Sequence, residues 1–181
     1  LKLTGKKIGD CKFVFCGFGA AGVAITELLL EMGAKHFTAV NRKGIMHADT
    51  VTDEVRRELV SRINPENRTG TLADAMEGAD VLIGVASGGL VTQNMVRSMA
   101  KDPILFPLSN PTPEIMPELA FEVGAAVVGT GRSDYKNQIN NVLAFPGIFR
   151  GALDVRASCI NGEMKKAASA ALAALVSDDE L

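Results

Sequence analysis

An apolar run that leads directly into a glycine series constrains the fold of this chain more than any other feature. Residues 13–16 read Phe-Val-Phe-Cys, residues 17–22 read Gly-Phe-Gly-Ala-Ala-Gly, and a mostly apolar stretch follows over residues 23–30. A short strand, a tight glycine turn and an apolar-faced helix are the parts of the first βα unit of a dinucleotide-binding fold.

Each glycine of the series has a predicted role. Gly17 permits the turn, Gly19 lets the backbone approach a pyrophosphate, and Gly22 lets the helix pack closely on the strand. The helix N-terminus offers free N–H groups to the same anion. Because a strand-to-helix turn without a ligand can show this pattern too, the rest of the chain has to decide between the two interpretations.

Composition places the chain among ordinary globular proteins. Its 181 residues are enough for one sizeable core, and 19 basic against 21 acidic residues give a net charge of -2. The sequence contains no block of like charges of the kind that binds nucleic acid or an anionic membrane. We therefore expect small-molecule partners. No apolar run approaches the roughly 20 residues that span a bilayer, and no signal peptide is recognisable, so the expected location is cytoplasmic.

The cysteines and histidines do not suggest a metal site or a disulfide framework. Cys11, Cys16 and Cys159 are unevenly spaced, and we expect all of them to be buried thiols. His36 and His47 have no metal-ligand spacing to other histidines or carboxylates, and we expect both in surface loops.

The end of the second predicted strand, residues 37–40, bears on the choice of cofactor. An acidic residue at this place binds the adenosine ribose 2′-hydroxyl in the dinucleotide fingerprint, but the chain has Asn41 there, followed by Arg42 and Lys43. A neutral amide does not repel a 2′-phosphate, and the cations can pair with it, which favours NADP over NAD. The alternative is that Arg42 and Lys43 are solvated loop charges.

Three more strands are predicted, over residues 80–85, 103–108 and 125–129. They lead into loops of small or amide-bearing residues at 86–89, 109–114 and 130–141. Ligands of open α/β sheets lie beyond the carboxyl ends of the strands, so this recurrence supports a ligand site there. Alternating strands and helices predict an α/β fold with a doubly wound, mostly parallel sheet of the Rossmann type.

Helices are predicted between and after these strands. Residues 1–5 look like the last turn of a helix with a glycine stop, and residues 52–63 place Val55, Leu59 and Ile63 on one apolar stripe. Thr71 and Asp74 have capping-box spacing at the start of a short helix.

The last two predicted helices span residues 148–155 and 161–176. In the second, an apolar face is expected to pack against the rest of the protein. It consists of Met164, Ala167, Ala168, Ala171, Leu172 and Leu175.

Over nearly its whole length the chain resembles the cofactor-binding domain of malic enzymes, especially the bacterial form. The resemblance rests on the glycine series and on five further motifs, Gly70-Thr-Leu-Ala-Asp-Ala, Gly78-Ala-Asp-Val, Ser109-Asn-Pro-Thr-Pro-Glu, Thr130-Gly-Arg-Ser-Asp-Tyr and Asn140-Asn-Val-Leu-Ala-Phe-Pro-Gly. It implies oxidative decarboxylation of (S)-malate to pyruvate and carbon dioxide, with hydride transfer to NAD or NADP and a Mg or Mn ion as Lewis acid. By position, Asn110, Asn140 and Asn141 resemble the asparagines that reach the nicotinamide and the malate, although Asn110 can also serve only the turn before Pro111.

The resemblance also implies what this chain lacks. The family's base lysine, its tyrosine acid and its acidic metal ligands belong to sequence upstream of Leu1. We therefore expect no catalytic or metal-binding residue in this chain, and we expect the isolated domain to be inactive. The resemblance also implies that the parent protein is a homodimer. Tyr135 is expected to be structural. Asn41 in place of the common aspartate and Lys136 in place of the usual proline are departures from the family pattern.

These inferences define one NAD(P)-binding domain over residues 1–181, with C-terminal helices from about residue 148. The expected cofactor-binding residues are Gly17, Gly19, Ala20, Ala21, Gly22, Asn41, Arg42, Ala86, Ser87, Asn110 and Asn140, and the expected substrate-binding residues are Asn110, Asn140 and Asn141. Two alternatives stay open, a related dehydrogenase of the amino-acid or shikimate type and a non-catalytic nucleotide-binding module.

Overall fold

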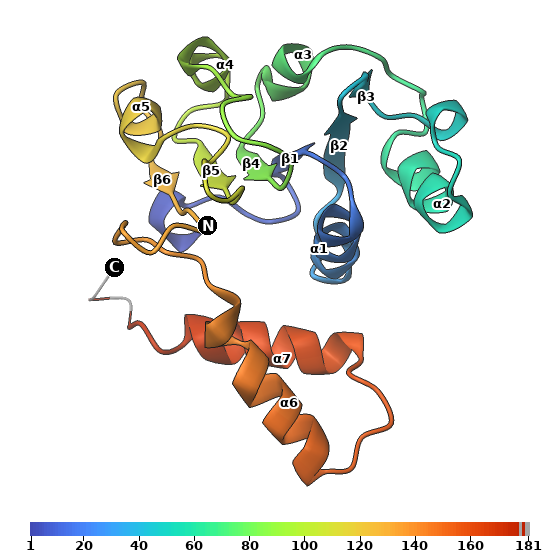
Figure 1. Ribbon diagram of the computed structural model, residues 1–181, viewed down its shortest axis with the longest axis vertical. Helices are drawn as coiled ribbons and strands as arrows, with labels where there is room; N and C mark the ends of the chain where they lie inside the picture. Colours follow the sequence, from blue (N-terminus) through green and yellow to red (C-terminus); the bar gives the residue numbers. More distant parts are fainter. Residues whose placement is uncertain (178, 180–181) are drawn as a thin grey trace.

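A twisted sheet covered by helices on both faces forms the main body of the protein, and a helical hairpin extends from it (Figure 1). The computed structural model describes residues 1–177 and 179, so residues 178, 180 and 181 of the predicted domain lie outside the described residues. The strands are β1 (Lys12–Cys16), β2 (His36–Asn41), β3 (Gly44–Ile45), β4 (Val81–Gly84), β5 (Ile104–Pro107) and β6 (Val127–Val128). The helices are α1 (Ala20–Glu31), α2 (Glu54–Ile63), α3 (Leu72–Met76), α4 (Gln93–Arg97), α5 (Pro117–Phe121), α6 (Phe145–Asp154) and α7 (Gly162–Ala173), with short 3-10 turns η1 (Lys2–Thr4), η2 (Ala48–Thr50) and η3 (Asn141–Leu143).

The sheet has the order β3-β2-β1-β4-β5-β6. All neighbouring strands are parallel except β2 and β3, which form an antiparallel pair. The strand order reverses beside β1, because the chain runs from β1 outward to β2 and then crosses back to β4. This arrangement confirms the predicted doubly wound α/β fold. Sequence analysis missed β3, because a two-residue strand has no periodicity to detect.

Alternation along the strands divides the apolar side chains between two cores. On one face Phe13, Phe15 and Phe37 pack with α1 and α2, and the rings of Phe13 and Phe37 stack with centroids 5.4 Å apart. On the other face Val14 and Leu82 pack with side chains of α3, α4 and α5. Strand β4 is buried along its entire length, as its continuous apolar run predicts for a parallel strand between two helical layers.

The predicted apolar stripe of α2 is partly wrong. Val55 is 67% exposed, whereas Leu59 and its neighbour Val60 are buried. Helix α2 therefore presents a face rotated from the expected one, since burial depends on where the helix meets the sheet and not on spacing alone. The helix starts at Glu54, two residues after the predicted start, because the Asp53 carboxylate accepts a hydrogen bond from the Arg56 N–H and caps it.

The start of α3 follows its sequence signal. The Thr71 hydroxyl accepts from the Asp74 N–H, and the Asp74 carboxylate accepts from the Thr71 N–H at 2.7 Å, so the predicted capping box is confirmed. The Thr71 N–H and the Thr71 hydroxyl both donate to the Asp74 carboxylate, and these two hydrogen bonds lower the pKa of Asp74. The cap positions Thr71 and Leu72, which lie at the carboxyl end of the sheet.

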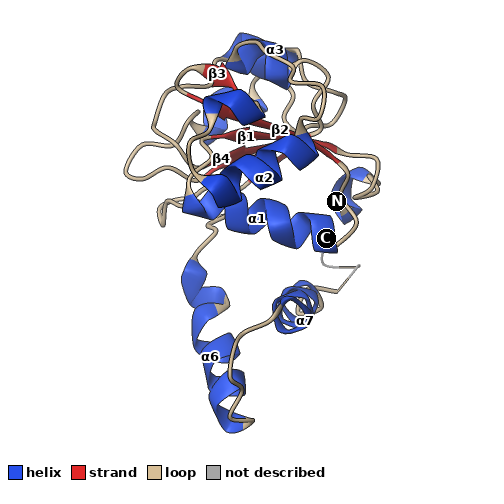
Figure 2. Cartoon of the chain, turned by 90° about the vertical axis from the view of Figure 1, so that its right-hand side faces the viewer, coloured by secondary structure: helices blue, strands red, loops and turns tan. Residues whose placement is uncertain are grey.

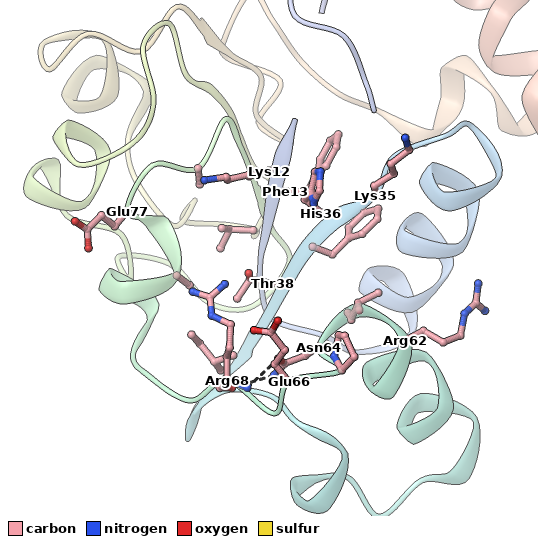
Figure 3. A pocket seen from close by; sticks show the side chains of 17 residues that line it. Lys12, Phe13, Lys35, His36, Thr38, Arg62, Asn64, Glu66, Arg68 and Glu77 are labelled. Carbon is pink, nitrogen blue, oxygen red and sulfur yellow. Dashed lines mark hydrogen bonds between the residues drawn. The ribbon is translucent and has the colours of Figure 1, made fainter. Parts of the chain in front are cut away.

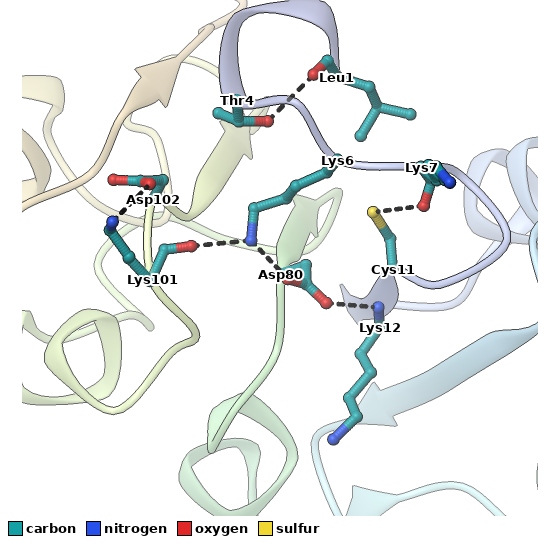
Figure 4. A network of polar contacts seen from close by, with 9 residues as sticks. All are labelled: Leu1, Thr4, Lys6, Lys7, Cys11, Lys12, Asp80, Lys101 and Asp102. Atoms are coloured by element: carbon teal, nitrogen blue, oxygen red, sulfur yellow. Dashed lines mark hydrogen bonds and ion pairs between the residues drawn. The ribbon is translucent and has the colours of Figure 1, made fainter.

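The segment before β1 is tied to the amino ends of the strands (Figure 4). It opens with the 3-10 turn η1, and Gly5 ends this turn in a left-handed conformation. The predicted last helical turn with a glycine stop is therefore a short 3-10 turn. Lys6 Nζ then donates to Asp80 Oδ1 at 2.5 Å and to the Lys101 carbonyl at 2.8 Å, while the Lys12 N–H donates to Asp80 Oδ2 at 2.9 Å. Burial opposes ionisation of Asp80, but these hydrogen bonds and the charges of Lys6 and Lys12 outweigh it and lower its pKa.

Helices α6 and α7 form the hairpin that extends from the main body, and α7, seen end-on in Figure 2, passes across α1 and contacts it. Helix α6 begins at Phe145, before the predicted start, and α7 ends at Ala173, before the predicted end. No residue of either helix is buried. The expected packing face of α7 is thus only partly covered: Met164, Ala168 and Leu172 are half-buried, but Leu175, beyond the helix end, is 77% exposed.

Three further expectations need correction. Cys159 is exposed, unlike the buried Cys11 and Cys16, because it lies in the connection between α6 and α7. His36 belongs to strand β2, and His47 is half-buried at the cap of η2. Across the described residues, no helix combines the length and apolarity needed to cross a membrane.

Candidate functional site

A cavity of about 900 Å³ lies at the carboxyl end of the sheet, beside the point where the strand order reverses. Its lining comes from the ends of β1 and β2, from the residues that follow β1, β2 and β4, from the start of α3, and from Leu90 and Met95 before and within α4. Six of the predicted cofactor-binding residues line it, namely Gly17, Gly19, Asn41, Arg42, Ala86 and Ser87. The volume is within the range of small-molecule sites, and the place is the one that open α/β sheets use for ligands.

The glycines of the first turn have the geometry that a dinucleotide requires. Gly17 has φ +94°, and a Cβ there would lie 2.8 Å from Ala86 Cβ and from the Val85 carbonyl oxygen. A Cβ on Gly22 would meet Phe18 and the Gly17 carbonyl at 3.0 and 3.1 Å, so this glycine allows α1 to sit close to β1. Gly19 faces open space, with no atom of the described chain within 4 Å of its Cβ position.

The start of α1 is open as well. Gly19 is the N-cap, and Ala20 and Ala21 in the first turn are exposed. No acidic side chain occupies this turn, so an anion would meet N–H groups without a competing carboxylate. The residues of the glycine turn therefore fit the pyrophosphate of a nicotinamide cofactor.

Asn41 ends strand β2 and shapes the adjoining turn. Its side-chain Oδ1 accepts a hydrogen bond from the Lys43 N–H at 2.7 Å, which leaves Nδ2 as the donor available to a ligand oxygen. Arg42 and Lys43 are exposed at the rim of the cavity. The side of the cavity formed by Asn41, Arg42 and Lys43 therefore has neutral and positively charged side chains. Strand β3 follows these residues directly.

A buried carboxylate that sequence analysis overlooked connects the loops after β4 and β5. Glu114 is 0% exposed. Its Oε1 accepts from the Ala86 N–H at 2.9 Å and from the Ser109 hydroxyl at 2.6 Å, and its Oε2 accepts from the Ser109 N–H at 3.2 Å. Gly84 leaves the room for it, since a Cβ there would lie 2.4 Å from the Glu114 carboxyl carbon.

The backbone reinforces this connection. The Gly89 N–H donates to the Pro113 carbonyl and the Val91 N–H donates to the Glu114 carbonyl, both at 3.0 Å. Gly88 passes so close to Thr112 that a Cβ would lie 2.6 Å from the Thr112 carbonyl oxygen. The two loops thus form one unit. A glutamate in a proline-rich loop gives no sequence signal of burial, although its place after Ser109 at the end of a strand could have drawn attention to it.

The asparagines predicted to reach the nicotinamide and the malate lie farther along the same end of the sheet and do not line the cavity. Asn110 is exposed, with its side-chain amide next to Gly131. Asn140 caps η3 by accepting from the Val142 N–H at 3.0 Å, and Asn141, the first residue of η3, is exposed. Their assignment to nicotinamide and malate remains a prediction.

A small polar cluster holds the loop between β6 and Asn140. Arg132 donates to both carboxylate oxygens of Asp134, at 2.9 and 2.6 Å, and its guanidinium lies 5.4 Å from the centre of the Tyr135 ring. The Tyr135 hydroxyl donates to Glu118 of α5 at 2.7 Å, a hydrogen bond that raises the pKa of the tyrosine. These contacts agree with a structural role of Tyr135.

A second cavity, of about 380 Å³, lies at the amino ends of β1 and β2 (Figure 3). Lys12, Thr38 and Arg68 contribute to its walls, and Asn64 anchors the Arg68 backbone through two hydrogen bonds of 2.9 Å. It contains no glycine turn and no free N-terminus of a long helix. The cavity at the carboxyl end is therefore the candidate cofactor site. In the part of the chain that the structure describes, no three His, Cys, Asp or Glu residues come together as a metal site would require.

The fold and the glycine turn define a dinucleotide-binding protein of the Rossmann class. Comparison with known sequences narrows the class, since the family model described as malic enzyme, NAD binding domain, matches residues 1–181. The chain therefore belongs to the malic enzyme family, as its NAD-binding domain.

Individual relatives agree with this assignment. The chain is 54% identical to the bifunctional malic/malolactic enzyme of Bacillus subtilis over 100% of its own length and 45% of the relative's. The NAD-dependent malic enzyme of Thermotoga maritima has a similar structure, with a TM-score of 0.80 and 48% identity over 84% of this chain and 41% of that one. The malic enzyme of Pyrococcus horikoshii gives a TM-score of 0.81 and 42% identity over 92% of this chain and 41% of that one. The chain thus spans less than half the length of these relatives.

Proposed function

We propose that this chain is the cofactor-binding part of an enzyme that oxidatively decarboxylates (S)-malate to pyruvate and carbon dioxide with reduction of NAD(P). The observation that supports this most strongly is the glycine turn at the cavity: Gly19 and the start of α1 are open, Gly17 leaves no room for a Cβ, and Gly22 packs closely on Phe18. Family membership supplies the reaction class.

In this proposal the residues 17–22 bind the pyrophosphate through backbone N–H groups, and Asn41 and Arg42 bind the adenosine ribose and its substituent. Ala86 and Ser87 form the wall under the nicotinamide half. The cofactor, when bound, supplies the hydride acceptor. The work of this chain is to hold and orient that acceptor.

The substrate end is assigned to Asn110, Asn140 and Asn141, whose amides can donate and accept hydrogen bonds without adding charge. The base, the acid and the ligands of a Mg or Mn ion are assigned to other parts of the parent protein. We further propose a single domain over residues 1–181, a homodimeric parent and a cytoplasmic location. The family resemblance supports the dimer, and sedimentation of the parent protein tests it.

The proposal predicts that the 181-residue chain binds a nicotinamide cofactor but does not oxidise malate. Titration calorimetry with NADP⁺ and NAD⁺ should give saturable binding, and the Gly19→Glu variant, which places a carboxylate at the pyrophosphate, should lose it. In an absorbance assay with malate and Mg or Mn ions, sustained cofactor reduction at the rate of a complete enzyme would contradict the proposed division of labour.

The preference between the two cofactors is a separate prediction. Both NAD-dependent and NADP-dependent malic enzymes occur among the relatives. Because Asn41 lacks a carboxylate and Arg42 and Lys43 adjoin it, we expect NADPH to bind more tightly than NADH. Asn41→Asp should narrow or reverse the difference.

The matched control is Asn161→Asp, which introduces the same charge at the N-cap of α7, where aspartate is equally suitable. This control should leave the calorimetric preference unchanged. Equal affinities of the starting chain for NADPH and NADH would remove the argument from Asn41.

A further inference from the structure

Among the residues that the structure describes, the buried carboxylate of Glu114 has no cationic partner. Its described contacts are the Ala86 N–H, the Ser109 N–H and the Ser109 hydroxyl, and no ion pair is found for it among residues 1–177 and 179. The two N–H groups can only donate, one to each oxygen, so both carboxylate oxygens serve as acceptors. A buried charge is usually paired, so a positive group of a ligand is a candidate for the missing partner.

Glu114 lies directly behind the wall of the cavity. It holds the Ala86 N–H, and Ala86 lines the cavity together with Val85 and Ser87. Its charge also acts on Cys16, at the end of the neighbouring strand β1, because burial and the negative charge of Glu114 together raise the pKa of Cys16 to about 12. Cys16 is another lining residue, so this carboxylate acts on a second part of the cavity lining.

The order of the strands indicates which half of a cofactor would meet this field. The adenosine half is expected at Asn41, at the end of β2, and the pyrophosphate at the turn after β1. The other half then extends over β4 and β5, on the far side of β1 from β2. This half is the nicotinamide ring, which has a positive charge when oxidised and none when reduced.

We propose that Glu114 makes this site select the oxidised cofactor over the reduced one by serving as the countercharge of the nicotinamide ring. The proposal rests on the proposed cofactor binding and adds a preference that family membership does not specify. In it, Glu114 is a positioning residue for the two loops and also the source of a charge that distinguishes the redox states. Oxidised cofactor is then favoured on entry, and the attraction disappears once the ring has accepted hydride.

The test compares the affinity ratio of the two redox states in the chain and in Glu114→Gln. The ratio of the dissociation constants of NADPH and NADP⁺, measured by calorimetry, should fall on the order of tenfold in the variant, since the amide keeps the size of the side chain but has no charge. The NADH and NAD⁺ pair replaces them if the chain binds that pair more tightly. A purely structural role would weaken both states equally and leave the ratio unchanged.

Two controls separate charge from shape. Ser109→Ala removes the hydroxyl donor at 2.6 Å but keeps the carboxylate, so both affinities can fall while the ratio stays constant. The 2′-phospho-ADP-ribose fragment, which lacks the nicotinamide ring, should bind Glu114→Gln and Ser109→Ala with similar affinity.

The unchanged chain provides a measurement that does not depend on the folding of a variant. It should bind the oxidised form more tightly than the reduced form, and the reverse order overturns the proposal, as does an unchanged ratio in a folded Glu114→Gln. If both forms bind but the ratio does not move, only this inference fails. If neither form binds, the proposed function fails as well.

Discussion

The sheet-bearing body, residues 1–140, and the α6–α7 hairpin differ in where their apolar side chains lie. In the body, both faces of the sheet are covered, and Phe15, Leu82 and Leu105 are fully buried. In the hairpin, no helical residue is buried, and Phe145 and Phe149 contact each other with ring centroids 4.6 Å apart while both remain exposed. An amphipathic pattern therefore indicates that a helix has an apolar face, but it does not tell what covers that face.

The largest expected effect contrasts a core leucine with a hairpin leucine. Leu82→Ala in β4, a 0% exposed position, should lower the free energy of unfolding by about 2–5 kcal/mol, because it removes buried apolar volume and leaves a cavity. Leu153→Ala in α6, 72% exposed, should change it by no more than about 0.5 kcal/mol. Urea denaturation of the 181-residue chain measures both. A loss at Leu153 as large as that at Leu82 would mean that the hairpin packs more tightly than described.

Glycine substitutions test the same contrast between the body and the hairpin, with a smaller expected change in the free energy of unfolding. Gly17→Ala combines φ +94° with a Cβ 2.8 Å from Val85 and Ala86, so we expect a loss of roughly 1–3 kcal/mol together with weaker cofactor binding. Gly151→Ala, inside α6 with open space at the Cβ position, should instead stabilise the chain by about 0.5–1 kcal/mol. Thermal unfolding followed by circular dichroism distinguishes the two signs. A stabilised Gly17→Ala would remove the argument that this turn requires glycine.

The smallest effect concerns ion pairs and pH. Since the folded state lowers the pKa of Asp80, its contribution is present above the unfolded value of about 3.9 and is lost as the pH falls through the lower folded value. Lys6→Met should therefore cost about 1 kcal/mol at neutral pH, and the deficit should shrink in acid. Arg150→Met, which breaks the exposed pair with Asp154 on α6, should cost no more than about 0.5 kcal/mol.

Unfolding titrations at several pH values provide the comparison for this pair of variants. A deficit of Lys6→Met that is constant down to pH 2 would show that Asp80 is not its partner. A cost of Arg150→Met as large as that of Lys6→Met would contradict the contrast between the body and the hairpin.

Much of the fold follows from local signals, and the sites where prediction failed have physical causes. The continuous apolar run at β4 and the reciprocal cap of Thr71 and Asp74 are encoded by neighbouring residues, so they could be identified directly. The burial of Leu59 instead of Val55 depends on how α2 meets the sheet, and β3 exists only because the Asn41 turn reverses the chain. Such features need tertiary contacts that no short window contains.

The candidate site divides in the same way. The glycine turn could be predicted because the role of each glycine is a property of the local backbone. Glu114 could not, since its burial depends on Gly84 at the end of β4 and on Ala86 and Ser109, which come from two different loops. A charged residue in a loop is ordinarily solvated, and only the fold shows that this one is enclosed.

The sheet ends on both sides in strands of two residues, β3 and β6. At the edge formed by β3, the Ile45 N–H already donates to the Gly70 carbonyl at 2.8 Å. At the edge formed by β6, the chain continues into a β-bridge between Thr130 and Gln138. Short and occupied margins give another chain little backbone with which to extend the sheet, which protects against fibril-like stacking.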